Sequence, residues 1–396
     1  MSEKNPKNWK VKRLGDFLVP LMKSKLPSGL SDKNGYYNFY VCSQNVLKSF
    51  HNEMSSPAVL LSTGGEAVVH YANGEYSYST DVWATNFTGE IYNEYAFRIF
   101  EKDLEKINYS GFQGSGIKHL DKKFIEKLTY AIPSLSEQNK ITSILTSVDE
   151  VIVTTQKQID KFQDLKKATM NELLTRGIDH KEFKDSVLGR IPKSWEVKTL
   201  IDVATNGISN GVFNDPKMQG SGYRLINVYD MYQGFGIDDK QLTKLDISEK
   251  EFQKNKVKYG DIFLTRSSLK LEGIAHCNIC LSNEDDITYD GHLMKISPNT
   301  LMVEPIFLVL QCLSDYGRIF FMKMAKQSTM TTIGQQDIAP LSIALPALEE
   351  QKKIVIVHNS FETKIDALKL KLNQIQSLKK SLMQVLLTGK VRVKVN

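Results

Sequence analysis

Apolar residues recur at alternating steps of four and three along two stretches of the chain. Seven of the ten positions in the first row are apolar, and eight of ten in the second. A sustained four-three pattern keeps one apolar stripe towards a partner helix, so both stretches predict long coiled-coil helices. The positions predicted to pair the helices are Ile141, Leu145, Val148, Ile152, Ile159, Phe162, Phe361, Ile365, Leu368, Leu372, Ile375 and Leu382.

The two helices are expected to begin near Ser136 and Glu349, each just after a proline. A helix of about 40 residues would span about 60 Å at 1.5 Å per residue. Two similar helices in one chain could bury each other's stripe side by side and antiparallel. The alternative is that each helix packs only on its own globular body.

The second stretch is an altered copy of the first. Residues 132–177 match residues 345–390 at a constant offset of 213 without a gap, and 16 of 46 positions are identical. Unrelated sequences of ordinary composition would share about three. The apolar stripe breaks at Lys166 and at its equivalent Lys379, where the leucine preceding each lysine is expected to take over the contact. An interruption of the stripe at the same position in both copies supports duplication.

A second repeated motif opens each half of the chain. Residues 6–16 and 192–202 agree at seven of eleven positions, around Trp9 and Trp195. The offset here is 186, so the body that follows is 27 residues longer in the second half. Each half therefore predicts a Pro-x-x-Trp start, a variable globular body and a closing long helix.

The two bodies are expected to be mixed and β-rich. Short aromatic or β-branched runs, broken by Gly, Asn or Ser, predict strands. An apolar stretch at 303–324, with Pro305 suited to a first turn, predicts helix. These predicted strands are 36–41, 58–62, 67–71, 222–228 and 261–265.

The predicted fold class is α+β. It comprises two globular mixed α/β domains separated by two long antiparallel coiled-coil helices, with a pseudo-two-fold internal duplication. The predicted order is a first domain (1–131), a first long helix (132–177), a linker (178–191), a second domain (192–344) and a second long helix with a tail (345–396).

Composition adds a weak bias towards a polyanionic partner. Lys plus Arg exceed Asp plus Glu by 51 to 45, a net charge of +6. Residues 1–12 lack the apolar core of a signal peptide, and no stretch of about eighteen apolar residues predicts a membrane span. Four cysteines are too few for a disulfide framework in 396 residues. We therefore expect a cytoplasmic protein with reduced thiols and no membrane contact.

Three repeated motifs together carry a family resemblance. They are the paired Pro-x-x-Trp motifs, the Ile-Pro-x-Leu-x-Glu-Gln-x-Lys-Ile motif at 132–141 with Leu345 opening its second copy, and Leu-Leu-Thr at 173–175 and 386–388. In this combination the chain resembles the specificity subunit of type I restriction-modification enzymes. The resemblance covers nearly the whole chain, and each motif alone would be weak.

The resemblance implies a non-catalytic subunit that reads double-stranded DNA. Two target-recognition domains would each read one half of a split, asymmetric site, and the helices would set the spacer. Two methyltransferase (M) subunits would bind the helices, and two restriction/translocase (R) subunits would complete a complex with adenine methyltransferase, endonuclease and ATPase activities. No cofactor is expected in this chain. A coiled-coil scaffold without a DNA role and a stand-alone DNA-modifying enzyme are the alternatives.

Small polar and basic residues at strand ends are the candidates for base contact, because hydroxyl, amide and guanidinium groups can reach groove edges. In the family this strand-to-loop region lies close to DNA. A second pair of loops, 113–119 and 327–332, precedes the helices and could contact phosphate through Lys118. Structural turns account equally well for such residues, and a lone histidine such as His292 is more often structural. The candidates are Ser62, Thr63, Gly64, Lys118, His119, Thr265, Arg266, Ser267, Ser268, His292, Gln327 and Thr329.

Motifs for catalysis and metal binding are incomplete. Neither residues 5–7 nor 215–217 form the Asn/Asp-Pro-Pro-aromatic motif of adenine methylation. Residues 388–390 end like a P-loop, but the leading Gly and the following Ser or Thr are missing. Cys277 and Cys280 are a single pair where zinc needs four ligands, so we expect buried thiols there. We assign no catalytic or metal-binding residue.

Overall fold

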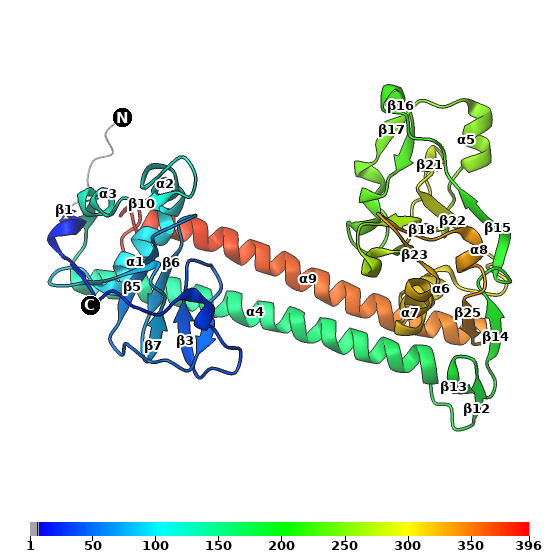
Figure 1. Cartoon of the computed structure of the whole chain (residues 1–396), viewed down its shortest axis with the longest axis horizontal. Helices are drawn as coiled ribbons and strands as arrows, with labels where there is room; N and C mark the ends of the chain where they lie inside the picture. Colours follow the sequence, from blue (N-terminus) through cyan, green and yellow to red (C-terminus); the bar gives the residue numbers. More distant parts are fainter. Residues whose placement is uncertain (1–5, 7, 396) are drawn as a thin grey trace. The chain divides into compact units, whose positions relative to one another are not determined.

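The structure is a computed structural model that describes residue 6 and residues 8–395 (Figure 1). The chain forms two compact units, Met1–Gln158 with Leu368–Asn396, and Ile159–Ala367. Each unit contains one mixed α/β body and part of both long helices. Lys7 of the first Pro-x-x-Trp motif, the first five residues of the predicted first domain and the last residue of the predicted tail lie outside the described residues.

The long helices α4 (Leu135–Arg176) and α9 (Leu348–Leu386) confirm the predicted coiled coil, and each begins one residue before its expected start. In the first unit, Ile141 near the start of α4 shares a core with Leu386 at the end of α9. In the second unit the end of α4 packs on the start of α9 in the same way. The two helices therefore run antiparallel (Figure 1).

The first body contains two small sheets. The larger has the antiparallel strand order β2-β8-β5-β6, and helix α1 packs on β5 and β6. The smaller has the order β4-β3-β7, with β3 and β7 parallel. Every residue of β5 is buried, in agreement with its uninterrupted apolar run. The bounds are β2 Leu18–Pro20, β3 Tyr37–Tyr40, β4 Leu47–Ser49, β5 Ala58–Ser62, β6 Val69–Ala72, β7 Tyr76–Tyr78, β8 Val82–Phe87, α1 Asn93–Lys102, α2 Leu104–Ser110 and α3 Lys122–Lys127.

The second body repeats this topology. Its larger sheet has the order β15-β22-β18-β20, and its smaller sheet the order β17-β16-β21, with β16 and β21 parallel. The duplicated sequence motifs therefore enclose duplicated sheets. The bounds are β15 Ala204–Asn210, β16 Gln219–Ile226, β17 Thr243–Leu245, α5 Glu249–Asn255, β18 Ile262–Thr265, β20 Cys277–Ile279, β21 Ile287–Tyr289, β22 Leu293–Pro298, α6 Pro305–Leu313, α7 Asp315–Met324 and α8 Gln335–Ile338.

A two-stranded sheet closes each body beside its long helix. In the first unit β1 (Lys10–Arg13) pairs with β11 (Thr129–Ile132), and in the second β14 (Glu196–Thr199) pairs with β25 (Ser342–Leu345). Each pair joins the strand after a Pro-x-x-Trp motif to the strand before a long helix. The two sequence motifs of each half are therefore neighbours in space.

The predicted strands are present, and the stretch predicted to be helical at 303–324 is confirmed. It comprises two helices that meet at 65°, and the Ser314 side chain caps α7 by accepting from the Gly317 N–H. The predicted linker, 178–191, contains most of the hairpin β12 (Phe183–Ser186) and β13 (Gly189–Pro192), which the sequence pattern did not indicate. Among the described residues, no single helix has the length and apolar composition of a membrane span.

Part of the extra length of the second body lies in one connection of the smaller sheet. Residues 227–242 join β16 to β17, whereas residues 41–46 make the corresponding connection between β3 and β4. The longer connection contains two turns of 3-10 helix, Tyr229–Tyr232 and Asp239–Gln241. The two bodies therefore share a sheet framework and differ in this loop.

Candidate nucleic-acid interface and helix junctions

The structure brings together the two predicted DNA-contact loops of the first body. Gly64 and His119 form an isolated antiparallel bridge. The Gly65 N–H donates to the Lys118 carbonyl at 2.9 Å, and the Leu120 N–H donates to the Thr63 carbonyl at 3.0 Å. The hairpin formed by β9 (Phe112–Gln113) and β10 (His119–Leu120) thus continues the end of β5.

The second body brings its candidate loops together in the same way. Strand β19 (Ser267–Ser268) pairs with β24 (Thr331–Thr332), which also pairs with β23 (Lys326–Gln327). The Arg266 N–H donates to the His292 carbonyl at 3.1 Å, so His292 joins the same group. Two loops that are distant in sequence meet at equivalent places in both bodies.

Three of the candidate hydroxyl groups are used inside the loops. Ser62 Oγ donates to the Glu66 carbonyl at 2.7 Å and accepts from the Val68 N–H at 2.9 Å. Thr63 Oγ1 donates to a backbone carbonyl at 2.7 Å, and Thr265 Oγ1 accepts from a backbone N–H at 3.0 Å. Ser62 and Thr265 are also buried, so these three side chains shape the loops as structural turns.

The remaining candidates reach solvent to different degrees. Arg266 is half-buried and its Nη1 donates to the Gly291 carbonyl at 3.0 Å. Gly64, Ser267 and Ser268 are partly buried, and Ser268 Oγ accepts from the Lys270 N–H at 3.2 Å. The exposed candidates are Lys118, His119, His292, Gln327 and Thr329.

Two exposed apolar residues beside these loops were not among the candidates. Ile117 is 73% exposed next to Lys118, and Leu269 is 86% exposed next to Ser268. A pattern of polar and basic side chains does not mark apolar residues such as these. Apolar side chains can contact the thymine methyl group or a base face, so both belong to the candidate surface.

A repeated glutamine fixes the start of each long helix. Gln138 Nε2 donates to the Glu90 and Pro133 carbonyls at 2.7 and 3.0 Å, and its Oε1 accepts from the Tyr92 N–H. Gln351, its equivalent, does the same with the Met302 carbonyl, the Pro346 carbonyl and the Glu304 N–H. Because both side chains are fully buried, this triple contact explains the Gln of the repeated motif.

A repeated glutamate connects each helix start to the tryptophan of the Pro-x-x-Trp motif. Trp9 Nε1 donates to Glu137 Oε2 at 3.1 Å, and Arg392 Nε donates to Glu137 Oε1 at 2.6 Å. In the second unit, Trp195 Nε1 donates to Glu350 Oε2 at 3.1 Å. In this unit His180 takes the place that Arg392 has in the first, and its Nε2 lies 2.8 Å from Glu350 Oε1.

A glycine after each helix allows this Trp–Glu contact to close. Gly177 has φ +67°, and a Cβ there would lie 2.6 Å from Trp195 Cζ2. Gly389 has φ +69°, and a Cβ there would overlap Pro6 and lie 3.4 Å from Trp9 Cε2. Any side chain at either position would combine left-handed backbone strain with a steric clash.

The lysines that interrupt the two apolar stripes form reciprocal ion pairs. Lys166 pairs with Glu362 in the second unit, and Lys379 Nζ lies 2.6 Å from Asp149 Oδ1 in the first. Asp149 and Glu362 are equivalent positions of the duplication, as are the two lysines. The expectation that the preceding leucines take over was wrong, because Leu165 and Leu378 are 49% and 52% exposed.

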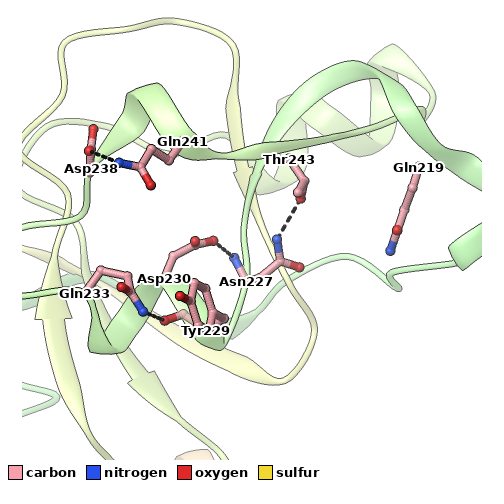
Figure 2. A pocket seen from close by; sticks show the side chains of 8 residues that line it. All are labelled: Gln219, Asn227, Tyr229, Asp230, Gln233, Asp238, Gln241 and Thr243. Atoms are coloured by element: carbon pink, nitrogen blue, oxygen red, sulfur yellow. Dashed lines mark hydrogen bonds between the residues drawn. The ribbon is translucent and has the colours of Figure 1, made fainter. Parts of the chain in front are cut away.

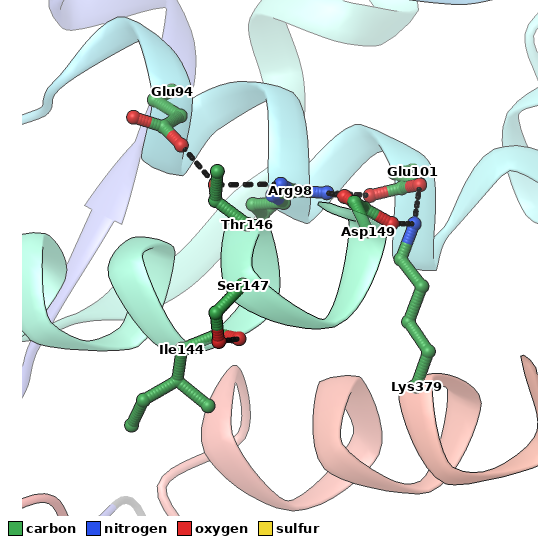
Figure 3. A network of polar contacts seen from close by, with 8 residues as sticks. All are labelled: Glu94, Arg98, Glu101, Ile144, Thr146, Ser147, Asp149 and Lys379. Atoms are coloured by element: carbon green, nitrogen blue, oxygen red, sulfur yellow. Dashed lines mark hydrogen bonds and ion pairs between the residues drawn. The ribbon is translucent and has the colours of Figure 1, made fainter. Parts of the chain in front are cut away.

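In the first unit this ion pair extends into the body (Figure 3). Lys379 Nζ also lies 2.5 Å from Glu101 Oε1 of α1, and Arg98 Nη1 lies 2.9 Å from Glu101 Oε2 and 2.5 Å from Asp149 Oδ2. Burial disfavours the charge on Arg98, yet Glu101 and Asp149 outweigh it and raise the pKa of the guanidinium. Charges from α1, α4 and α9 thus meet in one network.

The residues predicted to pair the helices face away from solvent. Five are buried, namely Ile141, Leu145, Ile159, Ile365 and Leu368. The other seven are partly buried, namely Val148, Ile152, Phe162, Phe361, Leu372, Ile375 and Leu382. His358 occupies the position equivalent to Leu145 and is also fully buried.

The paired cysteines of the second body lie in its core. Cys277 and Cys280 are both buried free thiols, at β20 and just after it. Burial raises the pKa of both thiols, that of Cys277 well above its usual value. Both are therefore protonated near neutral pH and pack as small apolar groups.

The comparison with known families decides the assignment. The sequence matches the family "Type I restriction modification DNA specificity domain" over residues 6–163 and 192–377. The chain belongs to this family of type I restriction-modification specificity subunits. The two matched segments contain the two bodies and most of both long helices. The membership supports a role in DNA-sequence recognition by a non-catalytic subunit that acts with modification and restriction subunits.

Individual relatives span nearly the same length. The type I restriction enzyme MjaVIII specificity subunit of Methanocaldococcus jannaschii is 27% identical over 98% of this chain and 94% of the relative. The EcoDI specificity subunit of Escherichia coli is 21% identical over 89% and 81%. The crystal structure of the S subunit from M. genitalium matches with a TM-score of 0.60 at 13% identity, covering 98% of both chains. This last similarity shows a shared fold.

Proposed function

We propose that this specificity subunit reads a split, asymmetric site in double-stranded DNA, with one body for each half-site. The observation that carries the proposal is the pair of equivalent loop groups. Both bodies place a strand-end loop beside a second loop on the same framework, and the two groups differ in sequence. Identical frameworks with unlike contact residues would recognise unlike half-sites.

The exposed side chains of these loops have the chemistry for DNA contact. Lys118 can neutralise a phosphate, and His119 beside it can donate to or accept from a groove edge. In the second body, Gln327, Thr329 and His292 offer amide, hydroxyl and imidazole groups. Ser267, Ser268 and Arg266 lie partly buried behind them. Ser62, Thr63 and Thr265 would act by holding the loops in shape.

The duplicated helices supply matching surfaces for two copies of one partner. Five pairs of equivalent positions are identical and exposed in both copies. They are Lys140 with Lys353, Ser147 with Ser360, Gln163 with Gln376, Leu165 with Leu378, and Lys167 with Lys380. We assign these surfaces to two M subunits, with two R subunits joining to complete the restriction complex. The proposal includes a cytoplasmic location, because the substrate is cellular DNA.

Co-expression with the cognate M subunit, followed by sequencing of methylated genomic DNA, tests this function. The expected result is one split motif with methylated adenine in both halves and a fixed spacer. A complex that forms and adds no methylation would contradict DNA reading and favour the scaffold alternative. Methyl-donor binding by the purified chain would instead revive the enzyme alternative.

A further inference from the structure

The second body has a polar pocket that the assigned functions do not use (Figure 2). Its volume is about 550 Å³. The first residue of β16, the long connection 227–242 and the first residue of β17 provide its lining. The lining residues are Gln219, Asn227, Tyr229, Asp230, Gln233, Asp238, Gln241 and Thr243.

The pocket is built from the connection that distinguishes the two bodies. Residues 227–242 supply six of the eight lining residues. The corresponding connection of the first body, 41–46, is much shorter. A feature restricted to one body can contribute to recognition of one half-site only.

The lining is rich in hydrogen-bond acceptors and amides. Among the described residues that line it, two are acidic and none is basic. Asn227 and Gln219 are held in place, since Asn227 Nδ2 donates to Thr243 Oγ1 at 2.8 Å and Gln219 Nε2 donates to Asn214 at 2.8 Å. Two carboxylates repel a phosphate, and they attract a ligand that donates hydrogen bonds.

Two of the amides are only loosely held. Gln233 Nε2 and Gln241 Nε2 make hydrogen bonds of 3.3 Å, to the Tyr229 carbonyl and to Asp238 Oδ2. Both side chains are exposed. A ligand with a planar donor and acceptor edge could replace these long contacts at small cost.

One aromatic residue lines the pocket, and another aromatic residue and two lysines are sequence neighbours of residues at the pocket. Tyr229 is 72% exposed, and Phe213, next to the Asn214 that holds Gln219, is 79% exposed. Exposed apolar rings of this kind can contact a neighbouring thymine methyl group in the major groove. Lys240 and Lys244 are exposed beside the lining residues Gln241 and Thr243, where they could reach the backbone phosphates of a bound strand.

Hydrogen bonds connect the pocket to the candidate interface of the same body. Asn214 Nδ2 donates to Asn227 Oδ1 at 2.9 Å and to Asp290 Oδ2 at 3.0 Å. Asp290 Oδ1 in turn accepts from the His292 N–H at 2.7 Å. The pocket therefore borders the group formed by His292 and Arg266.

We propose that this pocket binds the major-groove edge of a base that presents an exocyclic amino group there, adenine or cytosine, in the half-site read by the second body. The amino group would donate to the Asp230 or Asp238 carboxylate, and Gln233 and Gln241 would meet the adjoining ring edge. Guanine O6 and N7 and thymine O4 present acceptors to these carboxylates and are disfavoured. The inference rests on the proposed function and adds the residues that select one base.

The test uses the complex of the full chain with its M subunits. Genomic methylation first defines both half-sites for the wild-type complex. Asp238→Asn replaces an acceptor-only group by an amide, and Gln233→Ala removes one amide. Gln253→Ala, an exposed glutamine in α5 of the same body that does not line the pocket, is the control. Thermal melting of each protein identifies any folding defect.

We expect Asp238→Asn and Gln233→Ala to relax the base preference at one position of one half-site by roughly tenfold, with normal melting. The other half-site and the Gln253→Ala control should keep the wild-type motif. A duplex with purine in place of that adenine, or 2-pyrimidinone in place of that cytosine, lacks the amino group. Wild type should bind this modified duplex roughly tenfold more weakly than the unmodified duplex. For Asp238→Asn the loss of affinity between the two duplexes should be much smaller.

The outcomes separate the two proposals. An unchanged motif at wild-type rates in both variants, or wild-type affinity for the duplex without the amino group, overturns the pocket assignment. A wild-type complex that methylates no split motif overturns the proposed function itself.

Discussion

At the scale of single residues, His358 shows how far the duplicated stripe tolerates change. It occupies the position of Leu145 in the other copy, yet it is fully buried beside the Phe235 ring, at a centroid distance of 4.7 Å. Nδ1 lies 3.2 Å from Asn359 Oδ1, and Nε2 lies 3.5 Å from Glu362 Oε1 without forming a hydrogen bond within the described chain. Burial first, and the charge of Lys166 second, lower the pKa of this imidazole.

This lowered pKa predicts a pH effect on stability. Because the folded state prefers the neutral ring, the stabilisation is full above the unfolded pKa of about 6.5 and is lost as the pH falls below it. His358→Leu, which restores the residue of the first copy, should lose less free energy of unfolding between pH 7.5 and 5.5 than wild type. Denaturant unfolding at both pH values measures this, with the exposed His51→Asn as control. An identical pH dependence in His358→Leu would contradict it.

The candidate DNA residues show what a strand-end pattern can and cannot predict. The pattern located both loops, because polar residues after a buried strand leave the sheet at its edge. It could not tell inward from outward hydroxyls, since that depends on partners such as the Glu66 carbonyl and the His276 N–H. The side chains of Ser62 and Thr265 are therefore buried, and the polar pattern does not mark the exposed Ile117 and Leu269.

At the scale of elements, the lysines that interrupt the two apolar stripes have a physical explanation. A charged side chain in a helix seam destabilises any register in which it lacks a partner. Lys166 meets Glu362 and Lys379 meets Asp149 only in the observed antiparallel register. The periodicity of each helix revealed the two lysines that interrupt the stripes. It could not reveal the carboxylate that pairs with each lysine, because that carboxylate lies on the other helix. The Trp–Glu contacts were hidden because each joins residues that are far apart in the sequence.

Reversing one of these pairs tests their contribution. Lys166→Glu should destabilise the chain, because two carboxylates then face each other in the seam, and Lys166→Glu with Glu362→Lys should recover most of the loss. We expect a coupling free energy of about 1–2 kcal/mol from the double-mutant cycle. Lys167→Glu, exposed at the next position, is the matched control. A double-mutant cycle with no coupling free energy would show that the pair contributes nothing to the register.

At the scale of the whole molecule, the sequence repeats predicted the order of bodies and helices along the chain. They did not predict which strands pair. The parallel pairs β3 with β7 and β16 with β21 join segments that are far apart in the chain. No local pattern specifies such partners. The proposed function depends on the order of parts, with a variable body between constant motifs.

That modular order predicts independent half-sites. Replacing residues 13–131 by the corresponding body of another family member should change one half-site of the methylated motif and leave the other unchanged. The exchange preserves Trp9, Glu137 and Arg392, so the first body should still join its helices. Methylome sequencing of the chimaeric complex gives the result. A change in both halves would refute the assignment of one body to one half-site.

The helices predict how the spacer is measured. One heptad inserted after residue 158 and one after residue 367, where the chain divides into its units, keeps both seam ion pairs intact. Seven residues add about 10.5 Å to a helix, equal to about three base pairs at 3.4 Å each. The methylated motif should keep both half-sites and lengthen its spacer by that amount. A heptad in α4 alone should abolish methylation, because it removes Lys166 from Glu362 or Asp149 from Lys379. An unchanged spacer in the double insertion would show that something other than the helices sets it.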